Sequence, residues 1–225
     1  MYSKKKMKRI LSIITALSLT LIFTSCEAQT SKSRDVSKVG LQAPKGKAIA
    51  AFAVGCFWCS EHIYDSVAGI DSVISGYAGG TTPNPTYESV SRGNTGHAET
   101  VLVYYDPKIL SYSELTKVFF ASHDPTTLNQ QGPDKGTAYR SILFYRTPAE
   151  KALAQQAIRN ASLSGKFLKP IVTELKPLTA FYRAEAYHQN YEKKNPNDSY
   201  IRAVSKPRYD DFKKTYKGKL KEKDQ

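Results

Sequence analysis

Apolar residues gather in short runs between residues 47 and 177, and glycine or proline bounds most of these runs. Four runs rich in β-branched or aromatic residues predict strands at residues 47–54, 70–77, 99–105 and 139–145. Apolar residues at helical spacing predict two helices between these strands, at 56–67 and 111–123. The predicted order over the middle of the chain is therefore β-α-β-β-α-β.

That order is the split β-α-β arrangement of a ferredoxin-like fold, so we expect an α+β, two-layer sandwich. A helix at 148–162 and a strand at 172–177 extend it on the C-terminal side. Two long segments rich in Pro, Gly and Asn, 78–98 and 124–137, predict loops, the first with a helical turn at 87–91. Loops of this length in compact domains are often functional.

The N-terminal region has a different pattern. Five Lys and Arg residues between positions 4 and 9 precede an apolar stretch, 10–23, that is short for a membrane span. We interpret residues 1–26 as an export signal. Its end, FTSC at 23–26, resembles a bacterial lipoprotein signal, in which Cys26 becomes the lipid-bearing first residue after cleavage. Phe23 stands where such signals more often have Leu, which leaves a plain signal peptide as the alternative.

Length and charge complete the domain organisation. The 225 residues, 40% of them hydrophobic, suit one domain, which we place at 46–210. Residues 27–45 are polar and predict a flexible linker, and the lysine-rich residues 211–225 predict a solvated basic tail. The net charge is +13, but export makes nucleic acid an unsuitable partner. We expect a monomer, anchored to a membrane and facing the periplasm or the cell surface.

The stretch GCFWC at 55–59 carries the clearest chemical signal. Cys56 stands where a predicted strand turns into a helix, and the free N–H groups at a helix start favour a thiolate, the reactive form of cysteine. Gly55 permits the sharp turn. Cys59 follows at the Cys-X-X-Cys spacing of thiol oxidoreductases, where a disulfide can close.

Other roles also fit the two cysteines. They can be inert core residues, or half of a zinc site completed by two of the four scattered histidines at 62, 97, 123 and 188. The same pair also fits an exported thiol-disulfide oxidoreductase, which would need no sulfoxide-specific groups. A further alternative is a lipoprotein that only binds methionine-rich or oxidised peptides in an aromatic groove.

Several separated motifs resemble the A-type peptide methionine sulfoxide reductases. They are GCFW at 55–58, GYAGG at 76–80, NPTYESV at 84–90, TGHAETV at 95–101, QGPDKGTAYRS at 131–141 and FYRAEAYHQNY at 181–191. Their order and number make a chance match over about residues 47–210 very improbable. The resemblance implies reduction of the S epimer of methionine sulfoxide, in proteins or peptides, to methionine.

The resemblance also implies roles for single residues. Cys56 would be the nucleophile, Phe57 and Trp58 the apolar pocket for the substrate methyl group, and Glu99 the acid. Sulfoxide oxygen is a poor leaving group, so thiolate attack needs a proton donor, and an apolar setting can keep a carboxyl group protonated. Tyr87 and Tyr139 would hydrogen-bond the sulfoxide oxygen, and Asp134 would support the site. His97, beside Glu99, is interpreted as structural.

The chain departs from the family pattern in its second cysteine. Many members have glycine after GCFW and carry resolving cysteines in a C-terminal tail, whereas this chain has Cys59 and a tail without cysteine. We therefore expect Cys59 to condense with the Cys56 sulfenic acid. No metal or other cofactor is expected. The implied electron donor is thioredoxin or, for an exported enzyme, a thioredoxin-like periplasmic protein.

Overall fold

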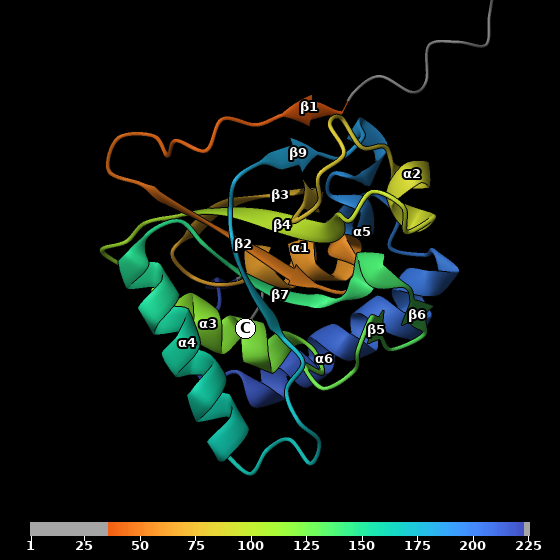
Figure 1. Cartoon of the computed structure of the whole chain (residues 1–225). Helices are drawn as coiled ribbons and strands as arrows, with labels where there is room; N and C mark the ends of the chain where they lie inside the picture. The colour runs from red at the N-terminus through yellow and green to blue at the C-terminus, as the bar shows by residue number, and fades with distance from the viewer. Residues whose placement is uncertain (1–35, 223–225) are drawn as a thin grey trace, which may run out of the picture. The chain divides into compact units, whose positions relative to one another are not determined.

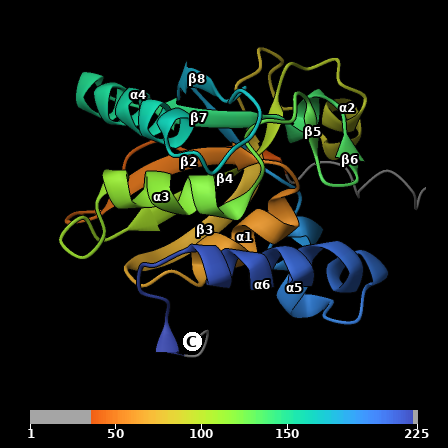
Figure 2. The same ribbon diagram turned by 90° about the horizontal axis from the view of Figure 1, so that it is seen from below.

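The computed structural model describes residues 36–222, which form a seven-stranded mixed sheet flanked by helices (Figure 1). The four central strands are β2 (Ala48–Val54), β3 (Ile70–Ala78), β4 (Ala98–Tyr105) and β7 (Ser141–Tyr145). They lie in the order β3-β4-β2-β7, and every neighbouring pair is antiparallel. Helices α1 (Phe57–Asp65) and α3 (Tyr112–Ser122), both labelled in Figure 2, connect them. This is the expected ferredoxin-like order, so the predicted fold class is confirmed.

Further elements extend this framework at both edges of the sheet. Helix α4 (Pro148–Leu163) leads to β8 (Glu174–Pro177), which runs parallel to β7, as the expected extra helix and strand. The other elements are β1 (Ser37–Lys38), α2 (Tyr87–Ser91), β5 (Gln130–Gln131), β6 (Asp134–Lys135), β9 (Phe181–Arg183), α5 (Tyr191–Lys194) and α6 (Lys206–Thr215). Single 3-10 turns occur at Thr137–Tyr139 and Ala186–His188, and a π-helical turn at Ile201–Ser205.

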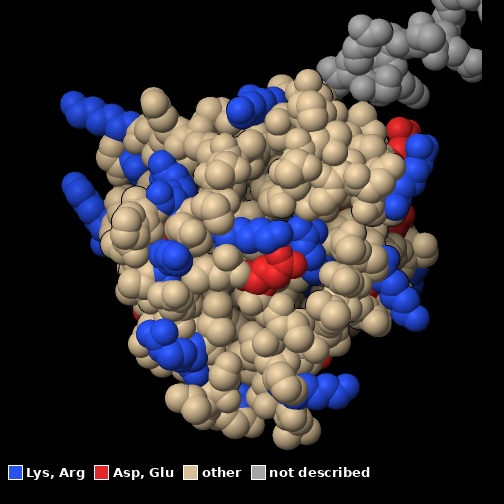
Figure 3. All heavy atoms as spheres, in the orientation of Figure 1, with Lys and Arg blue, Asp and Glu red and all other residues tan. Residues whose placement is uncertain are grey.

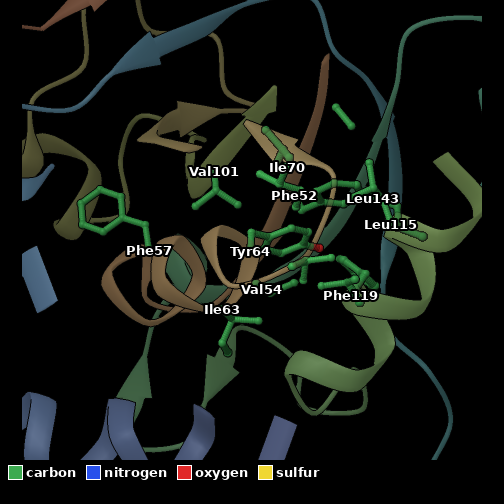
Figure 4. Packing of buried hydrophobic residues seen from close by; sticks show 14 of the residues in the cluster. Phe52, Val54, Phe57, Ile63, Tyr64, Ile70, Val101, Leu115, Phe119 and Leu143 are labelled. Carbon is green, nitrogen blue, oxygen red and sulfur yellow. The ribbon is translucent and has the colours of Figure 1, made fainter. Parts of the chain in front are cut away.

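Strand β2 is almost wholly apolar because both of its faces are buried. Its even positions, among them Phe52, face the helices, and its odd positions face the opposite side of the sheet. On the helix side the ring of Phe52 stacks on Tyr64 of α1 at 5.0 Å and meets Phe119 of α3 at 6.1 Å (Figure 4). This packing fixes the start of α1 against the end of β2.

The opposite face of the sheet is covered by extended chain, not by a helix layer. Val39, Leu41 and Ala43 pack on it, and β1 pairs with β9. The predicted flexible linker at 27–45 is therefore wrong for residues 36–45. Their apolar side chains alternate with polar ones, a strand-like period that lets a short segment shield an otherwise exposed apolar face. Residues 27–35 lie outside the described residues.

The predicted basic tail is also corrected. Helix α6 crosses the expected domain end at residue 210, and its Phe212 is only 1% exposed. Tyr209, Phe212 and Tyr216 form an apolar stripe at helical spacing among the lysines, and residue 220 forms a bridge with Val67. The lysines lie on the outer side of this helix, which is why the segment looked uniformly polar.

On the face drawn in Figure 3, Lys and Arg side chains are scattered among uncharged residues. None of the helices within residues 36–222 is long and apolar enough to cross a membrane. The predicted export signal and Cys26 lie outside the described residues.

Candidate active site

Cys56 lies at the turn between β2 and α1 and is the N-cap residue of the helix. Gly55 makes this turn with a φ of +86°, and a Cβ atom there would lie 2.5 Å from Cβ of Gln131. Glycine is therefore required both by the backbone and by the loop that packs on it. Cys56 is a free cysteine and 6% exposed, and it stands at the positive end of the helix dipole, which favours a thiolate.

Cys59 lies one helical turn further on, fully buried, and is hydrogen-bonded to Cys56. This hydrogen bond, followed by the charge of Arg208, lowers the pKa of Cys59 to about 6. Burial and the same neighbour raise the pKa of Cys56 well above its ordinary value. The two thiols thus titrate as one unit and share a single proton at neutral pH. Attack by Cys56 requires only that this proton moves to Cys59.

Glu99 lies at the start of β4, with its side chain 2% exposed. Its Oε2 accepts a 2.9 Å hydrogen bond from the backbone N–H of Phe57, the residue after Cys56. Burial raises the pKa of Glu99 to about 8, so the carboxyl group is protonated at neutral pH. With Oε2 held by Phe57, Oε1 is the oxygen available to carry the proton.

Tyr87 comes from the start of α2, and Asp134 and Tyr139 come from the segment before β7; all three lie near this carboxyl group. Burial raises the pKa of both tyrosines, with further contributions from the nearby charges of Glu99 and Cys56. Both phenols therefore remain hydrogen-bond donors at neutral pH. The structure brings the sequence-predicted residues into one site.

Phe57 and Trp58 follow Cys56 directly but have different surroundings. Phe57 is 1% exposed and packs against Tyr77 at 5.8 Å between ring centroids. Trp58 is partly exposed and stacks on Tyr191 at 3.7 Å. Trp58 and Tyr191 therefore form the partly exposed edge of this aromatic cluster.

His188 has no role expected from the sequence, although it lies within the motif at 181–191. Nδ1 of His188 accepts a 3.0 Å hydrogen bond from Nε1 of Trp58. Its ring lies 4.8 Å from Phe57 and 4.6 Å from Tyr87. Burial lowers the pKa of His188 to about 4, so the ring is neutral and its proton is on Nε2. The several aromatic residues in 181–191 are the sequence signal that could have indicated this aromatic cluster.

Two further missed residues support the site from the C-terminal part of the chain. Glu185 accepts from the hydroxyl of Tyr77 at 2.8 Å and from the backbone N–H of Tyr87 at 2.9 Å, which joins β3 to α2. The hydroxyl of Tyr200 donates to Asp134 and is also hydrogen-bonded to Cys56. Tyr200 thereby connects the Asp134 loop to the nucleophile.

The histidines occupy separate networks. His97 binds the loop at Gly80 and Thr82 through its two ring nitrogens, in keeping with a structural role, and His123 contacts Ser141 at 2.7 Å. Within residues 36–222, no three His, Cys, Asp or Glu side chains are grouped to hold a metal ion.

Comparison with known proteins identifies the family. Residues 48–221 match the family model described as peptide methionine sulfoxide reductase. The chain is 51% identical over 166 residues to peptide methionine sulfoxide reductase MsrA of Leptospira borgpetersenii, covering 74% of this chain and 93% of that protein. It is 45% identical over 192 residues to MsrA of Deinococcus radiodurans, and the match covers 85% of this chain and 93% of that protein.

Solved structures agree with these relatives. Reduced Mxr1 of Saccharomyces cerevisiae is 36% identical with a TM-score of 0.65, covering 73% of this chain and 92% of that one. Methionine sulfoxide reductase A of Corynebacterium diphtheriae is 34% identical with a TM-score of 0.66, and the match covers 69% of this chain and 78% of that one. The chain therefore belongs to the A-type peptide methionine sulfoxide reductases, oxidoreductases that return the S epimer of methionine sulfoxide to methionine.

Proposed function

We propose that the enzyme works through Cys56 as nucleophile, Glu99 as acid and Cys59 as resolving thiol. The observation that carries this proposal is the hydrogen bond of 2.9 Å between Glu99 and the N–H of Phe57. It places a buried, protonated carboxyl group beside the nucleophile, where a sulfoxide oxygen must be protonated as it leaves sulfur.

In the first step, the Cys56 sulfur attacks the sulfoxide sulfur, and Glu99 gives its proton to the oxygen. Cys59 takes the Cys56 proton. The oxygen passes to Cys56 as a sulfenic acid, and methionine leaves as the reduced product. Tyr87 and Tyr139 act as hydrogen-bond donors to the same oxygen, because both phenols stay protonated beside Glu99.

In the second step, the Cys59 sulfur attacks the sulfenic sulfur of Cys56. A disulfide forms, the S–O bond breaks, and water leaves. The support for Cys59 in this role is that it lies one turn from Cys56 and is already hydrogen-bonded to it. The disulfide then requires two electrons and two protons from an external dithiol, for which we propose a thioredoxin-like protein.

The test compares sulfoxide reduction with general disulfide exchange. The full chain, reduced with dithiothreitol, is incubated with a peptide carrying methionine (S)-sulfoxide and, separately, with insulin. Mass spectrometry measures the loss of one oxygen from the peptide, and turbidity measures insulin reduction. We expect rapid loss of oxygen that Cys56→Ser abolishes. Insulin reduction without oxygen loss would instead favour the disulfide oxidoreductase alternative, and peptide binding that survives Cys56→Ser without oxygen loss would favour the binding lipoprotein.

We further propose that the enzyme is an exported monomer anchored through a lipid on Cys26. The support is the basic and apolar pattern of residues 4–23 followed by a cysteine. The full chain expressed in a bacterium should incorporate labelled palmitate and sediment with membranes, while Cys26→Ala should do neither. Palmitate incorporation that persists in Cys26→Ala would contradict the anchor at this residue.

A further inference from the structure

Cys59 has a second polar neighbour besides Cys56, and it comes from the C-terminal segment. The hydroxyl of Ser205 is hydrogen-bonded to Cys59, and the Ser205 side chain is 1% exposed. Ser205 closes the π-helical turn Ile201–Ser205, directly before α6. Such turns insert one extra residue into a helix and are frequent at functional sites because they turn a side chain toward a new partner.

Ser205 also contacts Glu192. Its hydroxyl donates to Oε2 of Glu192 in a short hydrogen bond. The other oxygen of Glu192 lies 3.8 Å from Nε2 of His62, and the two side chains are 14% and 20% exposed. Together with Trp58 and Lys193 they line a small hollow of about 10 Å³, close to the space that one water needs. A continuous polar path thus runs from Cys59 to the surface.

Arg208 supplies the fixed positive charge near this path. It donates to the carbonyl oxygens of Val54 at 2.6 Å and Ser122 at 2.7 Å, which holds the guanidinium beside the turn before Cys56. Its charge lowers the pKa of Cys59, and that of Glu192 raises it. Further groups that face Cys59 are Cys56 itself, Glu99 from β4 and Tyr200.

We propose that Ser205 and Glu192 form a proton relay for the resolving step, with Arg208 holding the Cys59 thiolate that results. The proposal rests on Cys59 as resolving thiol. After the sulfoxide step, Cys59 carries the proton taken from Cys56, and this proton must leave before Cys59 attacks. It moves to Ser205 while Ser205 passes its own proton to Glu192. The S–S bond forms, the S–O bond breaks and hydroxide leaves. Glu192 releases the proton that came from Cys59 to water in the hollow, and this one proton neutralises the hydroxide, so the net products are the disulfide and one water.

The relay is tested by the lifetime of the sulfenic acid. The full chain with Cys26→Ser is mixed with one equivalent of a peptide carrying methionine (S)-sulfoxide and quenched over time at pH 6 to 9. Dimedone adducts of Cys56 and the Cys56–Cys59 disulfide are then counted by mass spectrometry. We expect Ser205→Ala and Glu192→Gln each to slow disulfide formation at least about tenfold at pH 7, in the range of a lost proton transfer. The slowing should shrink as pH rises, because hydroxide replaces the relay.

Matched variants separate the relay from packing. Ser205→Thr keeps the hydroxyl and should stay within about threefold of wild type. Ser66→Ala removes another buried serine, which donates to Ile63 at 2.7 Å, and should leave disulfide formation unchanged. Glu192→Gln preserves side-chain shape, so it decides the matter even where Ser205→Ala fails to fold.

Two outcomes would overturn the relay, and they differ. Equal disulfide rates in wild type, Ser205→Ala and Glu192→Gln at every pH would remove the relay and leave Cys59 as the resolving thiol. A wild-type enzyme that forms no Cys56–Cys59 disulfide at all would overturn the relay together with the proposed role of Cys59.

Discussion

The active site is built from two regions of the chain that differ in how they hold their side chains. Residues 55–139 supply Cys56, Glu99 and the two tyrosines, each placed by a strand end, a short helix or a turn. Residues 181–208 supply His188, Arg208 and others, held mainly by hydrogen bonds to distant parts of the chain. The first region positions the reacting groups by local backbone geometry. The second region supplies side chains that pack around them.

This difference teaches where substitutions should act. Changes in the first region remove a reacting group and should lower the rate of a chemical step. Changes in the second region, apart from the proposed relay residues Ser205 and Glu192, loosen the packing around these groups and should alter substrate affinity or the free energy of unfolding. The following predictions test that division.

The largest effect is expected for Cys59→Ser. Cys56 and Glu99 are intact in this variant, so a single turnover should still release about one methionine per enzyme. Turnover with a thioredoxin-like donor should collapse, because residues 36–222 of this variant offer the sulfenic acid no second thiol to condense with. Methionine release is measured by chromatography and the trapped Cys56 by dimedone. Near-normal turnover in this variant would mean that the donor attacks the sulfenic acid directly.

Glu99→Gln should lower the single-turnover rate of sulfoxide reduction by about 10²-fold or more, the usual contribution of a general acid. The amide keeps the shape of the side chain and can still accept from the N–H of Phe57, but it has no acidic proton to give. Rapid quenching measures methionine formation. A fall of less than threefold would remove Glu99 from the mechanism.

Phe212→Ala tests the part of α6 beyond the domain end expected from sequence. The Phe212 side chain is buried in the core, so its loss should reduce the free energy of unfolding by about 3 kcal/mol, roughly 10²-fold in the folding equilibrium. Urea unfolding followed by circular dichroism measures this change. Leu168→Ala, at a residue that is 99% exposed, is the control and should shift stability by less than about 0.5 kcal/mol. If Phe212→Ala and Leu168→Ala are equally stable, the segment beyond residue 210 is a solvated tail after all.

The pH dependence of sulfoxide reduction should show a plateau between about pH 6 and 8. Above a pKa of about 8, Glu99 loses the proton that it must donate, so the single-turnover rate should fall about tenfold per pH unit. Below a pKa of about 6 the thiol pair regains its second proton, and the rate should fall in the acid direction. Stopped-flow mixing at each pH measures both limbs. An alkaline limb that persists in Glu99→Gln would assign it to another group.

The smallest effect is expected at His188. His188→Phe keeps a ring but removes the acceptor for the indole N–H of Trp58, so KM should rise about fivefold with little change in kcat. His188→Asn offers an oxygen acceptor and should recover part of the loss. Trp58 is the only tryptophan, so its fluorescence reports the hydrogen bond directly. Unchanged fluorescence in His188→Phe would show that this contact does not hold Trp58.

Much of the first region could be predicted from the sequence because its signals are local. The apolar run of β2, Gly55 and Cys56 are contiguous, so strand, turn and reactive thiol follow from a few neighbouring residues. The convergence of Tyr87, Tyr139 and Asp134 was expected only from the family resemblance, since no periodicity brings two distant segments together. Their position in this chain became visible only through the sheet order β3-β4-β2-β7.

Helix α6, the turn before it and residues 36–45 escaped prediction for physical reasons. The lysines of α6 masked the apolar stripe of Tyr209 and Phe212, because composition averages over both sides of a helix. The π-helical turn that directs Ser205 toward Cys59 has no known sequence signature of its own, and it depends on packing against α1. Residues 36–45 were missed because a short alternating segment gains order only from the sheet face that it covers.

The docking of residues 36–45 on the sheet would limit the reach of the enzyme under the lipid anchor proposed above. With a lipid on Cys26, nine residues, 27–35, separate the lipid-bearing residue from Val36, the first of the described residues that pack on the domain. A chain of that length spans at most roughly 35 Å when fully extended. A flexible tether that continued through residue 45 would nearly double this maximum span. The enzyme would therefore repair proteins within a thin shell next to the bilayer, where neighbouring membrane proteins are its most frequent encounters.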